Sequence, residues 1–564
     1  MLELRSRQIL GSVMLLAVAA VTLVVAPYTL LDPISLPKLC TLTFFSIIAL
    51  SIMAPSVRWL FNSNFRVLLI TLILFVLQIF LVFFFSGANF GGQFYGTFGR
   101  NTGGLAYISL GTICLGVSLV SDKDFLKKFV RLALIIGAIL IFYGNIQYLG
   151  LEPFPFVNLY TINAPTGTLG NSNFQSAFMG LIAVVSFTMT LNTAFKIHTR
   201  IMLLVMGFAS IIVIYETLAK QGYLNFLAGV AAVAILWLFM KQRNKLALAV
   251  AGIVVVGGGL VFLGLVNAGP LANLIYKSSL AARGYYWRAA IKMLTDHPFF
   301  GVGMDGFGDW YKRTRPEDYF ANGFMTVSNS AHNVYLDIAS SGGFPLIAAY
   351  FAILTLVIIS IVKVVKRSTE FDVYFVAVVG AWVAYQVQAF VSINQIGLAI
   401  WGWVLSGLII GYEINTRVSE TTQSAPTNRK QKGNKVKSSV QPLSSRSVIS
   451  IFAGLIFGAL VAIPPYYANA SFFSAIESGD IKAIKAAAYL KPIDDRRLKN
   501  LAGILLNNKY DADAIVVIRE AVVNYPDSYD FWNMWLTIPT ASAGDLATVK
   551  AQLKRLDPFN PDFK

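Results

Sequence analysis

Residues 67–85 read VLLITLILFVLQIFLVFFF and contain no charged side chain. A helix that spans a bilayer needs roughly 20 mostly apolar residues, because its backbone must satisfy its own hydrogen bonds across about 30 Å of hydrocarbon. This stretch therefore predicts a transmembrane helix. The composition of the 564-residue chain agrees, since 56% of the residues are hydrophobic and only 13% are charged. Such a composition excludes a water-soluble globular protein.

The same apolar pattern recurs along the chain and predicts about thirteen spans. We expect them at 9–30, 38–54, 67–85, 104–120, 129–149, 174–193, 201–218, 222–240, 246–266, 344–364, 373–392, 397–412 and 449–467. The predicted fold class is all-α, a polytopic transmembrane helical bundle with a small extracytoplasmic helical-repeat domain near its C-terminal end.

Lysine and arginine residues in the short loops fall on one side of this predicted topology, among them Arg5, Arg58, Lys127, Lys196 and Lys241. Cytoplasmic loops carry the positive excess, so this side is expected to face the cytoplasm. We expect a multi-pass protein of the cytoplasmic (inner) membrane, surrounded by membrane lipids, with its C-terminal domain outside the cytoplasm. The net charge of +17 is then mostly a topology signal, and we expect no nucleic-acid partner.

The chain divides into four predicted parts. Residues 1–414 form the membrane domain, with a large outer loop at 267–343. A basic, polar linker follows at 415–446, which has too few apolar residues to bury a core and is expected to be disordered. A final transmembrane helix at 447–468 then leads to a helical domain at 469–564.

This last domain carries a repeated turn signal. Pro492, Pro526 and Pro558 recur 34 and then 32 residues apart, which is close to the period of tetratricopeptide repeats. Two or three helix pairs are few for a free-standing solenoid. We therefore expect a tetratricopeptide-like domain that docks on the membrane domain or on a protein partner.

Polar motifs gather in the outer loops. The segment 282–310 reads ARGYYWRAAIKMLTDHPFFGVGMDGFGDW, and 330–346 reads SAHNVYLDIASSGGFPL. With GTFGRNTGGL at 96–105 and GTLGNSNFQSAF at 167–178, they resemble the O-antigen ligase and polymerase superfamily of bacterial membrane glycosyltransferases. In that family an Arg precedes a Trp by four residues, a DHPxxGxG stretch follows, and a His-Asn pair opens the helix that returns to the membrane. The likeness spans roughly the first twelve helices.

The resemblance implies a fold of the C-type glycosyltransferases and a set of site residues. His332 and Arg283 would be catalytic, and Arg100, Lys220 and Arg283 would bind a substrate diphosphate. The supporting residues that the motifs imply are Asn333, Trp287, Asn171 and Asn173.

The resemblance also implies the reaction. A glycan would pass from a polyprenyl (undecaprenyl) diphosphate carrier to an acceptor at the outer membrane face: the lipid A core of lipopolysaccharide, a growing polysaccharide or a protein. The leaving diphosphate needs fixed cations, and the arginine fork suits phosphate oxygens best. His332 could take the acceptor proton or hold the acceptor near neutral pH. We expect no metal and no other cofactor.

Two positions depart from the family pattern. Lys220, in LAKQGY, stands where many members have Arg, so the charge is kept but the bidentate fork is lost. Leu346 stands where a second glycine is expected after Gly343, which is consistent with packing alone. Asp305 and Asp309 are expected to order the outer loop.

Other interpretations stay open. Arg100 could only snorkel to headgroups, and Lys220 could pair with Glu216 one helical turn earlier. The rival function is a multi-span transporter or lipid flippase, which would place ionisable residues near the bilayer midplane. A scaffold that recruits partners through its repeats is a third possibility. Convergence of Arg100, Lys220, Arg283 and His332 on one cavity would favour the enzyme.

Overall fold

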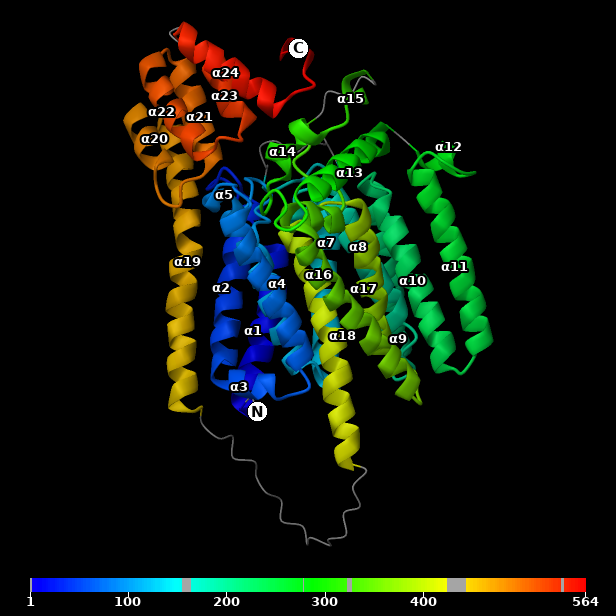
Figure 1. Cartoon of the computed structure of the whole chain (residues 1–564). Coiled ribbons are helices and arrows are strands. Elements are labelled where there is room, and N and C mark those ends of the chain that lie inside the picture. Colours follow the sequence, from blue (N-terminus) through cyan, green and yellow to red (C-terminus); the bar gives the residue numbers. More distant parts are fainter. Residues whose placement is uncertain are drawn as a thin grey trace.

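The chain forms an all-helical membrane bundle topped at one end by loops and a helical domain (Figure 1). This computed structural model describes residues 3–154, 164–276, 278–321, 327–423, 443–538 and 542–563, and these contain helices but no strand. The all-α fold class predicted from the sequence is confirmed.

The predicted spans are all present as helices. Within the described residues, twelve helices are long and apolar enough to cross a membrane: α1 (Leu4–Leu23), α2 (Ser35–Met53), α4 (Arg66–Phe85), α7 (Lys123–Tyr148), α8 (Ser172–Met189), α9 (Ile197–Glu216), α10 (Gln221–Met240), α11 (Asn244–Leu265), α16 (Val334–Arg367), α17 (Val373–Val391), α18 (Ile396–Gln423) and α19 (Ser445–Ser478). The thirteenth is α6 (Gly104–Val120), whose 17 residues reach the lower end of the spanning range.

Helix α18 is the centre of the bundle, since the apolar window in its first 22 residues is fully buried. It packs closely on α6 because Gly407 and Gly411 bring the two backbones together. A Cβ atom at Gly411 would lie 2.1 Å from the carbonyl oxygen of Ser118. Small residues of this kind let membrane helices approach closely, where lipid offers no hydrophobic driving force for association.

One lysine lies inside this apolar bundle. Lys38, near the start of α2, is fully buried. Its ammonium group donates hydrogen bonds to the carbonyl oxygens of Val21, Thr22 and Val24 at 3.1, 2.9 and 2.9 Å. The last carbonyls of a helix have no partner within it. Lys38 therefore caps the C-terminal end of α1.

The C-terminal part is a separate helical unit. Helices α20 (Ile481–Ala488), α21 (Asp495–Asn507), α22 (Asp511–Asn524), α23 (Tyr529–Leu536) and α24 (Ala543–Leu556) pack consecutively around their own core, which includes Leu501, Val517, Phe531 and Leu553. The tetratricopeptide assignment stays a prediction. Most of the predicted linker, 424–442, lies outside the described residues.

Figure 1 places this C-terminal unit and the outer-loop helices at the same end of the bundle. Those loop helices are α13 (Ser278–Asp296), α14 (Phe307–Thr314) and α15 (Asp318–Ala321). The remaining short helices are α3 (Val57–Phe61), α5 (Phe90–Tyr95) and α12 (Ala272–Ile275). Residues far apart in sequence therefore meet at this end.

Candidate active site

The motif loop after α13 is fastened to a kink in α16. The backbone N–H of Val302 donates to the carbonyl of Ser340 at 2.9 Å, and that of Phe344 donates to the carbonyl of Pro298 at 2.7 Å. Gly343 forms the kink with a φ of 74°. A Cβ atom there would lie 2.5 Å from the Pro298 oxygen, so glycine is required for both its conformation and its size.

Leu346 fills the space beside this kink. Leu346 is fully buried and packs against Gly342. A Cβ atom added to Gly342 would lie only 2.2 Å from the Cδ2 atom of Leu346. The departure from the family pattern at this position is explained by packing.

Arg100 is a buried residue at the join of two loops. Its guanidinium forms an ion pair with Asp305 at 3.1 Å, and the two side chains are 9% and 1% exposed. It also donates to the carbonyl of Asn329. Asp305 in turn accepts hydrogen bonds from the backbone N–H of Thr97 at 2.7 Å and from the hydroxyl of Thr102 at 3.2 Å. Arg100 therefore does not snorkel, and Asp305 orders the loop.

His332 lies directly before α16 with a φ of 52°, a left-handed conformation that is uncommon outside glycine. Its ring stacks on Tyr286 with centroids 5.5 Å apart. Burial and, to a smaller extent, the positive charges of Arg283 and Arg100 together lower the pKa of His332 to about 3. The imidazole is therefore neutral at physiological pH, and Arg283 and Arg100 both lie within electrostatic reach of it.

Arg283 supplies a cation with unused bonding capacity. It lies on α13 and is partly exposed. Burial lowers its pKa, while Tyr286 acts in the opposite direction. No carboxylate in the described part of the chain forms an ion pair with Arg283, in contrast to Arg100. Its guanidinium fork can therefore bind an incoming anion.

Three of the four predicted supporting residues, Asn333, Asn171 and Trp287, make structural contacts through their side chains. The Asn333 side chain caps α16 by accepting from the N–H groups of Tyr335 and Leu336 at 3.0 and 3.1 Å. Asn171 caps α8 by accepting from the N–H of Asn173 at 2.8 Å. Trp287 packs edge-on against Phe390, with ring centroids 5.7 Å apart.

Lys220 makes no side-chain hydrogen bond or ion pair with the other predicted site residues in the described part of the chain. It is exposed at the start of α10. It forms no ion pair with Glu216 within the described coordinates, and one carboxylate oxygen of Glu216 is buried there without a hydrogen-bond partner. Of the candidates from the sequence, Arg283 and Arg100 both act on His332, and a role for Lys220 in the site stays a prediction.

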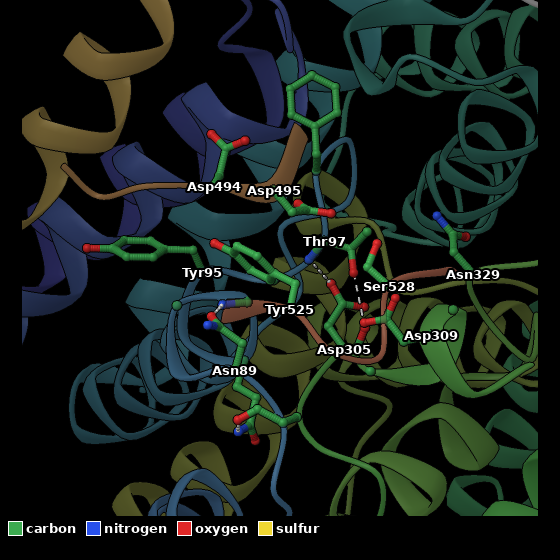
Figure 2. Close-up of a pocket in the computed structure, with 18 of the residues that line it drawn as sticks. Asn89, Tyr95, Thr97, Asp305, Asp309, Asn329, Asp494, Asp495, Tyr525 and Ser528 are labelled. Atoms are coloured by element: carbon green, nitrogen blue, oxygen red, sulfur yellow. Dashed lines mark hydrogen bonds between the residues drawn. The ribbon is translucent and has the colours of Figure 1, made fainter. Parts of the chain in front are cut away.

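A cavity of about 610 Å³ opens beside His332 (Figure 2). We call it the shared cavity, because two parts of the chain line it. The membrane wall includes Tyr95, Thr97, Asn101, Tyr286, Asp305, Asp309, Lys312, Asn329 and His332, whereas Arg100 and Arg283 are not among the residues that line the cavity. The tail wall comes from the C-terminal unit, at 492–499 and 525–530. A volume of this size is typical of small-molecule sites.

The tail wall is the part that sequence reasoning missed. Its side chains include Asp495, Lys499, Ser528 and Asp530, which resemble ordinary surface residues of a polar helical domain. No local signal identifies them, because they reach the cavity only when the C-terminal unit is docked.

Buried ion pairs hold that unit in place. Arg315, just after α14, donates to both carboxylate oxygens of Asp557 at 2.5 and 2.7 Å, and both side chains are 3% exposed. Arg313 pairs with Asp527 at 2.6 Å. The ammonium of Lys312 lies 3.1 Å from the ring centroid of Tyr529. The docking that the sequence predicted is thus made through α14 and the residues that follow it.

Asp309 lies on α14 at this junction. It borders the shared cavity. The surrounding protein and the carboxylates of Asp495 and Asp527 together raise its pKa to about 7. Lys499 and Arg313 act against this increase. Asp309 is therefore a carboxyl group that changes its charge near neutral pH.

Comparison with known proteins identifies part of this architecture. The O-antigen ligase family model matches residues 201–351, from α9 to the middle of α16, and this segment contains Lys220, Arg283 and His332. No curated protein matches the chain. The match supports glycan transfer of the ligase type by a multi-pass membrane protein, and it shows similarity to the O-antigen ligase family over residues 201–351.

Proposed function

We propose that this protein transfers a glycan from a polyprenyl diphosphate carrier to an acceptor at the outer face of the cytoplasmic membrane. One observation carries the proposal: the charges of Arg283 and Arg100 both act on His332 at the wall of the shared cavity. The acceptor is a lipid such as the lipid A core, a growing polysaccharide or a protein. The C-terminal unit is then extracytoplasmic, and the reaction uses no metal.

The reaction breaks the bond between the anomeric carbon and the diphosphate oxygen and forms a new bond from that carbon to the acceptor oxygen. The acceptor proton passes to His332, and the polyprenyl diphosphate leaves with the bonding electrons. Arg283 donates its fork to the diphosphate as negative charge develops there. Arg100 is already paired with Asp305, so its part is to hold the loops and contribute charge from a fixed place.

The low pKa of His332, about 3, has a direct consequence for this scheme. Such an imidazole is a weak base, and efficient proton transfer needs a base with a pKa nearer the working pH. A bound diphosphate would offset the positive charge of Arg283, which is one cause of the low value. Donor binding therefore raises the basicity of His332 before the acceptor reacts.

Two substitutions test the assignment in the full chain, purified in lipid nanodiscs. His332→Ala should abolish transfer and leave binding of a labelled polyprenyl-diphosphate glycan intact. Arg283→Lys should reduce turnover about a hundredfold, since one positioned electrostatic donor is typically worth that much. Arg288→Lys is the matched control, because Arg288 lies on the same helix but is 52% exposed and pairs with Asp318 at 3.4 Å.

If both site variants turn over normally while folded, the glycosyltransferase proposal is wrong. If His332→Ala loses donor binding and Arg283→Lys keeps it, the two roles are reversed. Movement of the donor across the bilayer without transfer would support the flippase alternative. Lys38 lends that alternative no weight, because its three hydrogen bonds serve to cap α1.

Topology is tested separately. A reporter that is active only outside the cytoplasm should work when fused after Lys564 and stay silent after Asn428. The reverse pattern would invert the orientation that the basic loops predict.

A further inference from the structure

We propose that the C-terminal helical unit is the acceptor-binding half of the shared cavity, and that it selects a sugar without phosphate groups. The inference rests on the proposed function, because it concerns the second substrate of that reaction. It assigns this role to Ser528 and Asp530 in the tail wall.

The first step is continuity between the two walls. The cavity that His332 borders is the same one that Lys499 of α21 and Asp530 of α23 border. An acceptor that offers its hydroxyl to His332 must therefore lie against the tail wall. The buried Arg315–Asp557 pair fixes this wall to the outer loop, so the two halves form one site.

The second step is an unused hydrogen-bonding group on each wall. The hydroxyl of Ser528, in the tail wall, and the side-chain oxygen of Asn101, in the membrane wall, have no hydrogen-bond partner among the described residues. The two residues are 4% and 6% exposed. Buried polar atoms are nearly always bonded in native proteins. A polar ligand that contacts both walls would supply the missing partners.

Ser528 is informative because its position has an obvious alternative use. It stands at the N-cap of α23, where a serine normally accepts a hydrogen bond from the helix backbone, yet its side chain makes no such bond. Figure 2 shows it near Thr97 and Asp309 in the cavity wall. Its hydroxyl therefore stabilises neither the helix nor the junction and remains available to a ligand.

The third step is the chemistry of the tail wall. Lys499 bridges Asp495 at 2.8 Å and Asp530 at 3.2 Å, and the Asp530 side chain remains 63% exposed. Carboxylates accept hydrogen bonds from hydroxyl groups and repel phosphates. The rings of Tyr525 and Tyr95, which also line the cavity, offer apolar faces for the C–H side of a sugar ring.

This chemistry favours a sugar over a peptide. Peptide sites usually offer apolar anchor pockets or a free strand edge. Apart from Pro492 and Ile493, the residues between 469 and 564 that line the cavity carry polar side chains. The diphosphate is assigned to Arg283, which acts on His332 but does not itself line the cavity.

The experiment measures sugar binding by saturation-transfer NMR with the full chain in nanodiscs. The probes are chitobiose as an amino sugar, N,N′-diacetylchitobiose as a neutral sugar, and glucose 6-phosphate as an anionic sugar. Wild-type protein should bind one or both of the first two more tightly than the third. Labelled donor is titrated into the same samples.

Two variants locate the binding. Asp530→Asn should weaken sugar binding about tenfold, and Ser528→Ala about fivefold, as expected for a charged and a neutral hydrogen bond. Neither should change donor binding. Ser528→Ala should also unfold at the wild-type temperature or above, because the hydroxyl has no partner to lose.

Matched controls exist within the same unit. Asp513 pairs with Lys485 at 3.1 Å and is 51% exposed, but it lies outside the cavity, so Asp513→Asn should bind sugar normally. Ser542 makes the capping box of α24, so Ser542→Ala should lower stability and leave sugar binding unchanged.

Wild-type sugar binding in both Asp530→Asn and Ser528→Ala would overturn the inference. So would tighter binding of glucose 6-phosphate, or binding of a peptide library in place of the sugars. If the wild-type chain binds sugars as described but no polyprenyl-diphosphate donor, the proposed function fails and the sugar site stands. If it binds and transfers the donor but the tail variants change nothing, only this inference fails.

Discussion

The two walls of the shared cavity are built differently. In the membrane wall, Arg100 and Asp305 form a pair with side chains 9% and 1% exposed. In the tail wall, Lys499 and Asp530 form a pair with side chains 19% and 63% exposed. Breaking a buried pair is costly, whereas an exposed pair contributes little to stability. Substitutions in the membrane wall should therefore disturb the fold, whereas side chains of the tail wall can be substituted without loss of the fold.

This difference suits a reaction with a common donor and a variable acceptor. The carrier diphosphate demands one geometry, which buried pairs and tight backbone contacts preserve. Acceptors differ between members of a superfamily, and a wall of exposed polar groups can adapt to them. The following predictions test this division by breaking each wall and the junction between them, in order of expected effect.

The largest effect is expected at the junction. Arg315→Ala leaves Asp557 buried without its partner, where both side chains are only 3% exposed. Breaking such a pair typically costs about 3–5 kcal/mol. The C-terminal unit should then separate from the outer loop, which faster amide hydrogen exchange in α14 and α24 would report.

Arg519→Ala is the control for that variant. Arg519 pairs with Asp545 at 3.0 Å within the same unit but is 53% exposed, so its loss should cost about 1 kcal/mol or less. Equal exchange rates in the two variants would show that the buried pair does not hold the junction.

The next largest effect is expected from a substitution that disturbs the membrane wall. Gly343→Ala puts a side chain at a φ of 74° and a Cβ atom 2.5 Å from the Pro298 oxygen. Backbone strain of this kind costs about 1–3 kcal/mol, and the motif loop should lose its attachment to α16. Donor binding should fall together with the thermal unfolding temperature.

Gly503→Ala in α21 should change the free energy of unfolding in the opposite direction, because a Cβ atom there meets open space. It should stabilise the C-terminal unit by about 0.5–1 kcal/mol. A Gly343→Ala protein as stable as wild type would contradict the account of the kink.

The smallest effect concerns pH at the junction. Asp309 is exposed at the shared cavity, and the surrounding protein, with the carboxylates of Asp495 and Asp527, raises its pKa to about 7 from an ordinary value near 4. The folded state therefore holds a proton that the unfolded state has lost, and this contribution to stability disappears as the pH rises from about 4 through 7. The thermal unfolding temperature should thus fall more steeply between pH 5 and 7 in wild type than in Asp309→Asn. Parallel curves would exclude Asp309 as the titrating group.

The sequence predicted the helices far better than the site. Apolar length is a local property, so every span could be placed before the structure was seen. The motif residues Arg283 and His332 were also found, and they lie within reach of each other. The role of Lys220 stays a prediction, because no contact in the described part of the chain links it to the other motif residues.

No local sequence pattern identifies the ion pairs and hydrogen bonds that shape the cavity. The Thr102–Asp305 hydrogen bond joins residues 203 positions apart, and the Arg315–Asp557 bonds join residues 242 positions apart. Aspartates in polar loops are common, and nothing in the neighbouring sequence distinguishes a buried partner from a solvated one. Tertiary packing alone assigned Asp305 to Arg100 and placed the tail wall opposite His332.

The capping lysine of the first hairpin has a consequence for biogenesis. A lone lysine at the centre of a spanning helix costs about 2.5–3.5 kcal/mol on insertion scales, and the cost is smaller near a helix end, where Lys38 lies. The three donors of Lys38 are satisfied by the end of α1, and this occurs only when α1 already lies beside α2. We therefore expect α1 and α2 to leave the translocon together as a hairpin. Helix α1 would then stay at the translocon until α2 has been synthesised.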